Sequence, residues 1–328
     1  MLALFLGAGF SKWAVDLPMA SQLFDFDIEP WGPRENKKLD IVKSLKHNWD
    51  VMHPDALSEQ FIADALNFDE KNRQAVLWYL TRRLSEPFIW KEFHAQKWRR
   101  HVLMIDENRK FNIPGVVKAH KFLLRFYLSL GGIITTNYDM IVEYALGAKG
   151  FNYGVPNQTL TGRGPYPVSQ WRNPVTLKGK VPVAKIHGSI SWDENACYTD
   201  GRRGLTGHAL IVAPTPEKRS PDSLKSVWEL AERILQRATC LVIFGFAFNP
   251  YDEAVLNLLK CAGSKLNSIL LIDIEPKIER VRKLWPDKMI IPCQPPPRGD
   301  LEIQSWLDIQ CSPDPLTCRC LSPLGQGT

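Results

Sequence analysis

The sequence has no apolar run of the roughly 20 residues that a membrane span requires. It also lacks a block of like charges, because 41 Lys and Arg against 35 Asp and Glu leave a formal net charge of +6 that is spread along the chain. This mild excess permits contact with nucleic acid but does not indicate it. The apolar start has no basic residues before it, unlike a signal peptide. We therefore expect a cytoplasmic protein that does not engage a membrane.

Paired cysteines are missing as well. The seven cysteines are odd in number and scattered, and they form neither a disulfide framework nor a Cys-x-x-Cys zinc module. Cys318 and Cys320 lie close together, but their spacing is wrong for a zinc ribbon. A Gly-x-x-x-x-Gly-Lys-Ser/Thr loop is also absent, so there is no sign of a nucleoside-triphosphatase. We expect no metal site and no zinc.

Short apolar runs alternate with helical patterns over most of the chain. The runs predict strands at 2–6, 133–136, 181–186, 209–212, 240–244 and 268–272. Helices are predicted at about 116–128 and 224–238, and another begins after residue 139. Strands that end in polar or glycine-rich loops and lead into helices are typical of an α/β fold. The sequence therefore predicts a Rossmann-like open parallel sheet.

The region from about 31 to 113 shows no convincing strand pattern and predicts a helical insertion, with two helices between 57 and 84. Residues 148–180 are rich in Gly, Pro, Asn and Thr, which predicts a long irregular loop. Residues 1–310 are then one domain that carries the insertion. The Pro-, Gly- and Ser-rich stretch 311–328 is predicted to be a disordered tail.

The first predicted strand runs directly into a glycine-rich turn. Gly7 and Gly9 would let the backbone approach a pyrophosphate, and the Ser11 hydroxyl could complete an anion site at the start of the next helix. A Gly-x-Gly sequence after an apolar run is equally compatible with a simple tight turn.

Polar residues follow the later predicted strands. Asn137 and Asp139 follow one strand, His187 another, the segment Gly245–Asp252 a third and Asp273 a fourth. Because ligands bind at the carboxyl ends of parallel strands, these residues are predicted to surround one crevice. From the residues alone, His187 could instead be a satisfied buried histidine and Asn137 only a helix cap.

The order of these short motifs over residues 2–276 resembles that of the sirtuins. The motifs are Gly7-Ala8-Gly9-Phe10-Ser11, Thr136-Asn137-Tyr138-Asp139, His187-Gly188 and Gly245-Phe246. The resemblance implies NAD as the ligand, with its phosphates bound by Gly7, Ala8, Gly9 and Ser11. It implies that Asn137 and Asp139 face the nicotinamide ribose and carboxamide and that His187 is a general base. Gly245 and Asp273 would lie on the adenosine half.

The sequence departs from the deacylase sirtuins at three places. The four-cysteine zinc module is reduced to Cys197, and Met19-Ala20-Ser21 stands where Asp-Phe-Arg is expected. Ala213-Pro214-Thr215 replaces the Phe-Gly-Glu that pairs with an acyl-lysine peptide. The resemblance is therefore to the bacterial defence branch, whose members deplete NAD when phage infection is sensed.

This resemblance implies an NAD glycohydrolase that releases nicotinamide and ADP-ribose. It also implies a homo-oligomer or a separate partner, first a HerA-type helicase ATPase and second a short Argonaute system, through which nucleic acid would be reached. Two alternatives remain open at this point. One is a zinc-free NAD-dependent deacylase or ADP-ribosyltransferase, and the other is a non-catalytic scaffold or sensor that holds NAD or ADP-ribose.

Overall fold

The computed structural model describes residues 1–30, 32–88, 114–126, 129–146, 151–153, 181–193, 207–213 and 222–296. The predicted tail at 311–328 and most of the predicted loop at 148–180 lie outside these ranges, as do Cys197, Cys318 and Cys320. Within the described ranges, no helix is long and apolar enough to cross a membrane.

Seven of the described strands form one parallel sheet in the order β3-β4-β2-β1-β7-β8-β9. Their bounds are β1 Leu2–Leu6, β2 Leu130–Thr135, β3 Phe151–Asn152, β4 Val181–Lys185, β7 Cys240–Phe244, β8 Ser268–Ile272 and β9 Met289–Cys293. β1 lies at the centre, with Leu4 and Phe5 fully buried, as expected of a strand covered on both faces. The predicted Rossmann-like open sheet is confirmed.

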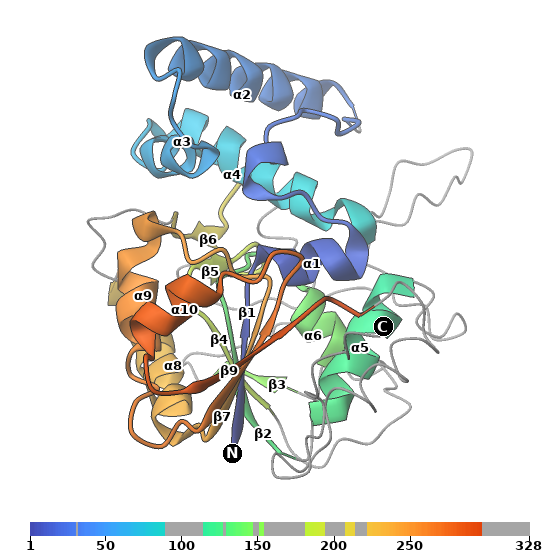
Figure 1. The fold of residues 1–328 in the computed structure, drawn as a ribbon. Helices are drawn as coiled ribbons and strands as arrows, with labels where there is room; N and C mark the ends of the chain where they lie inside the picture. The colour runs from blue at the N-terminus through green and yellow to red at the C-terminus, as the bar shows by residue number, and fades with distance from the viewer. Residues whose placement is uncertain are drawn as a thin grey trace, which may run out of the picture.

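Helices cover both faces of the sheet (Figure 1). α5 (Pro114–Phe126) and α6 (Ile141–Leu146) lie on one side, together with α1 (Ala8–Val15), which packs on α5. α8 (Lys225–Arg237), α9 (Glu253–Leu259) and α10 (Ile278–Leu284) lie on the other. α8 follows its predicted period, burying Val227, Ala231, Ile234 and Leu235. This amphipathic pattern is why its place on the sheet could be predicted.

The described part of the predicted insertion is helical. It contains α2 (Pro33–Met52), α3 (Ser58–Ala65) and α4 (Glu70–Ser85), followed by the short 3-10 helix η2 (Glu86–Phe88). These helices are stacked beyond one end of the sheet (Figure 1). The break predicted between α3 and α4 occurs at Asp69, whose side chain accepts hydrogen bonds from the amides of Lys71 and Asn72 and so begins α4.

The structure differs from the sequence prediction at the edges of the sheet. The run at 209–212 is not part of the main sheet, because β6 (Leu210–Ile211) pairs antiparallel with β5 (Gly188–Ser189). The stretch predicted as irregular from residue 148 contains β3. β9 was not predicted, and it contains Pro292, which an edge strand tolerates but which obscures a strand pattern.

The chain changes direction across the sheet at β1. It first builds β2, β4 and β3 on one side of β1 and later places β7, β8 and β9 on the other. β1 and β7 are neighbours, and the loops that follow them lead toward opposite edges of the sheet. The crevice between two such loops is called the switch point, and it is where open α/β sheets bind ligands. Those loops contain Gly7 and Gly245.

Candidate active site

Three glycines join the two loops at the switch point. The Gly7 amide donates to the Phe244 carbonyl at 2.9 Å, and the Gly9 amide donates to the Gly245 carbonyl at 2.9 Å. A Cβ on Gly7 would lie 2.4 Å from the Gly245 carbonyl oxygen, and Gly245 has a positive φ of 63°. The glycines thus allow the two backbones to touch. The sequence predicted that the loop with Gly7 and Gly9 binds phosphate, but the amides of these two glycines are hydrogen bonded to backbone carbonyls of the protein.

Asn137 is held at this joint by a buried hydrogen-bond network. Its Nδ2 donates to the Gly7 carbonyl at 2.8 Å and to Ser11 Oγ at 2.9 Å. Ser11 Oγ in turn donates to Asp139 Oδ2 at 2.7 Å. The backbone amide of Asn137 donates to Thr135 Oγ1 at 3.0 Å. Four of the predicted site residues, Gly7, Ser11, Asn137 and Asp139, are therefore joined by direct hydrogen bonds, and the Asn137 amide is fixed in one orientation.

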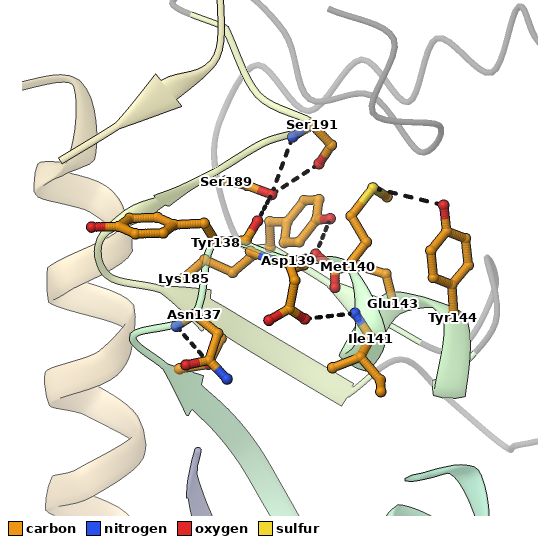
Figure 2. Close-up of polar contacts among 12 residues, drawn as sticks. Asn137, Tyr138, Asp139, Met140, Ile141, Glu143, Tyr144, Lys185, Ser189 and Ser191 are labelled. Carbon is orange, nitrogen blue, oxygen red and sulfur yellow. Dashed lines mark hydrogen bonds and ion pairs between the residues drawn. The ribbon is translucent and has the colours of Figure 1, made fainter. Parts of the chain in front are cut away.

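Asp139 is a buried carboxylate at the start of α6. Its Oδ1 accepts the Ile141 amide at 3.0 Å, as Figure 2 shows. Burial raises the pKa of Asp139, against the opposing effects of the Lys185 charge and of the hydrogen bonds from Ile141 and Ser11. A carboxylate whose neutral form is favoured in this way is unusual, and perturbed acids of this kind are enriched at functional sites.

An ion pair lies behind Asp139 and supports the loop that carries it. Lys185 Nζ donates to Glu143 Oε1 at 2.9 Å and also to the Asp139 carbonyl (Figure 2). Tyr153 donates to the same Glu143 oxygen at 2.8 Å. Lys185 and Glu143 are almost fully buried. The pair therefore connects the end of β4 to α6 beneath the Asn137–Asp139 loop.

His187 lies two residues after the end of β4 and is 4% exposed. Its Nε2 lies 3.5 Å from Asp252 Oδ1. Asp252 ends the 3-10 helix η5 (Pro250–Asp252), which follows the loop after β7. The sequence placed the segment Gly245–Asp252 at the predicted crevice but gave Asp252 no role in the site.

A cavity of about 200 Å³ lies where these residues meet. Six of the predicted site residues line it, namely Ala8, Ser11, Asn137, Asp139, His187 and Gly245. α3 of the insertion contributes Glu59, Gln60 and Ile62, which sequence reasoning did not assign to the site. Glu59, Asp139 and Asp252 are the acidic residues of the lining, and no described residue in it is Lys or Arg.

Three of the predicted residues do not line this cavity. Gly7 and Gly9 form the glycine joint beside it. Asp273, at the end of β8, accepts the Glu275 amide on Oδ1 at 3.1 Å and therefore closes its own turn. Met19 and Ala20, which stand where deacylases carry Asp-Phe-Arg, do line the cavity and give it an apolar wall.

A family model matches about half of the chain. Residues 131–290 match the family model of the SIR2-like domain. The SIR2-like match includes Asn137, Asp139, His187, Gly245 and Asp252, whereas the first glycine loop and the insertion precede it. No curated protein matches the sequence.

One solved structure, described as "Structural Basis for the Mechanism and Regulation of Sir2 Enzymes", is similar to this chain at 15% identity. The similarity covers 88% of this chain and 86% of that chain, with a TM-score of 0.40. A similarity at this level assigns no activity.

Among the described residues, no group of three or more His, Cys, Asp and Glu side chains could hold a metal ion.

Proposed function

We propose that the protein is an NAD glycohydrolase that cleaves NAD to nicotinamide and ADP-ribose. One observation carries the proposal: Asn137 and His187, which follow different strands, line one cavity at the switch point of the sheet. Both residues lie in the stretch that matches the SIR2-like domain. An NAD-related activity is what such a domain suggests.

The lining suits the cationic end of NAD. About 200 Å³ is less than the roughly 300 to 1,000 Å³ of typical ligand pockets, so the cavity fits a nicotinamide ribose better than the whole dinucleotide. Glu59, Asp139 and Asp252 surround it, with no Lys or Arg in the described lining. The carboxylates of Glu59 and Asp252 would stabilise the positive charge that develops on the ribose during cleavage, whereas burial favours the neutral form of Asp139. Ala8 and Ser11 are proposed to meet the phosphates, and Gly245 and Asp273 the adenosine half.

The proposed reaction is a displacement at the ribose carbon that bears nicotinamide. The bond from this carbon to the nicotinamide nitrogen breaks, its electron pair stays on that nitrogen, and a water oxygen bonds to the carbon. His187 accepts the proton that water loses and releases it to solvent, so that NAD and water give nicotinamide, ADP-ribose and one proton. The fixed Asn137 amide orients the ribose or the water, and no zinc is needed for this step.

We further propose that this activity serves antiphage defence by depleting NAD in the cytoplasm. Activation through a homo-oligomer or a separate partner, such as a HerA-type helicase ATPase, follows from the family resemblance. Nucleic acid would then contact the partner rather than this chain, whose described cavity lining is acidic.

The proposal is tested by incubating the purified chain with NAD, alone and with a HerA-type partner, and separating the products by chromatography. We expect loss of NAD with equal amounts of nicotinamide and ADP-ribose, and no loss in His187→Ala. Turnover that requires an acyl-lysine peptide would instead support a deacylase. NAD binding without cleavage in both samples would support a scaffold or sensor.

A further inference from the structure

We propose that Asp252 is a positioning residue for His187, orienting its imidazole and stabilising the imidazolium that forms when His187 accepts a proton. This inference rests on the proposed function and adds a residue from the loop after β7 to its mechanism.

The distance and the burial carry the inference. Asp252 Oδ1 lies 3.5 Å from His187 Nε2, and the two side chains are only 13% and 5% exposed. An opposite charge within about 4–6 Å favours the charged form of a histidine, and the effect is strongest where water does not screen it. A carboxylate facing one ring nitrogen also fixes the orientation of the imidazole and its tautomer.

The loop that carries Asp252 is held in place from two sides. Arg280 Nη1, from α10, donates to the carbonyls of Ala247 and Phe248, each at 3.0 Å. Asn249 Oδ1 accepts the Tyr251 amide at 3.1 Å, and the Asp252 amide donates to the Asn249 carbonyl at 2.9 Å. The backbone that carries the carboxylate is therefore held in place by the protein itself.

Other titratable groups face the same space. Tyr138 lies beside His187, with ring centroids 6.3 Å apart, and Glu59 approaches from α3. Burial, followed by the charges of Asp252 and Glu59, raises the pKa of Tyr138. Asp139 lines the cavity but is hydrogen bonded to Ser11 and the Ile141 amide. Among the described residues, Asp252 is the acid whose carboxylate lies within ion-pair distance of the His187 ring.

The test compares Asp252→Asn, which keeps the shape of the side chain and removes its charge, with Glu253→Gln. Glu253 is the next acid along, is exposed and does not line the cavity. The His187 imidazole is titrated by NMR in each protein and assigned with His187→Ala. We expect the pKa of His187 to fall by about 1 pH unit or more in Asp252→Asn and to remain unchanged in Glu253→Gln.

NAD cleavage is then measured against pH. In Asp252→Asn the acidic limb of the kcat/KM profile should move to lower pH, because a histidine with a lower pKa is already deprotonated at lower pH. The plateau of kcat should fall about 10- to 100-fold, because His187 is then a weaker and less well oriented base. KM should change less than about threefold. A merely structural role would lower thermal stability without moving the His187 titration.

The two measurements separate this inference from the proposed function. An unchanged His187 pKa in folded Asp252→Asn overturns the inference whether or not NAD is cleaved. A lowered pKa in a protein that leaves NAD intact supports the pairing and contradicts the glycohydrolase. A lowered pKa with an unchanged rate overturns the positioning role in catalysis.

Discussion

Ser11 shows how one small side chain organises the site. Its hydroxyl accepts from Asn137 and donates to Asp139, so both residues are fixed by a group that lies more than 120 positions away in sequence. A serine hydroxyl can do both at once because it is a donor and an acceptor. The orientation of the Asn137 amide, on which the proposed mechanism depends, therefore depends on Ser11.

Asp139→Asn tests the electrostatic state of this network. Because burial raises the pKa of Asp139, its ionised form is disfavoured in the folded protein, and this cost appears as pH rises above the ordinary aspartate value near 4. The variant lacks the cost. We expect the Tm of Asp139→Asn to rise relative to that of wild type between pH 4 and pH 8. Each kcal/mol by which the variant gains in free energy of unfolding corresponds to about 2–4 °C in Tm.

Thermal unfolding followed by circular dichroism at several pH values checks this expectation. Asp64→Asn is a matched control, since Asp64 accepts a hydrogen bond from Trp49 and does not line the cavity. A Tm difference for Asp139→Asn that shrinks as pH rises would show that Lys185 and the hydrogen bonds outweigh burial.

At the residue scale, sequence reasoning predicted that side chains just after the strands surround one crevice, and the structure brings Asn137 and His187 to one cavity. It did not predict the contact between Asp252 and His187 or the approach of Glu59, which lies on a helix of the insertion. Their proximity depends on tertiary packing, which local spacing does not encode.

At the scale of elements, the fold depends on the contact between the loops after β1 and β7. Gly245→Ala would place a Cβ 2.4 Å from Gly9 Cα at a φ of 63°, where a side chain is strained whatever the space. We expect a loss of several kcal/mol in the free energy of unfolding, since two backbones would have to separate.

Gly263→Ala provides the control for this prediction, because a Cβ there would approach the Lys260 carbonyl oxygen only to 3.8 Å. Urea unfolding of both variants gives the free energies. Equal stabilities of Gly245→Ala and Gly263→Ala would show that the joint is not tightly packed.

Elements were predictable from sequence where their pattern was long or strongly apolar. α8 and β7 lie within one residue of their predicted bounds, because amphipathic period and a buried β-rich run decide them. β3 and β6 have only two residues each, and their pairing is set by neighbours rather than by their own sequence. The apolar run at 209–212 did predict β6 as a strand, but no local signal gave its antiparallel pairing with β5, and none separated β3 from loop.

At the scale of the whole molecule, the cavity is assembled from segments that are far apart in sequence. The loop after β1, helix α3, the Asn137–Asp139 loop, His187 and the loop after β7 all contribute to it. The insertion is therefore part of the candidate site, since Glu59 and Gln60 of its helix α3 line the cavity. Sequence reasoning left open what the insertion does.

The rate of nicotinamide release from NAD tests the central claim most directly. Wild type, Asn137→Ala, His187→Ala and the control Gly263→Ala are compared at equal folded concentration, each with and without the HerA-type partner. The account predicts release in wild type and Gly263→Ala and at least about a 100-fold lower rate in the two cavity variants. Equal release in all four proteins would contradict it, and so would intact NAD in wild type with its partner.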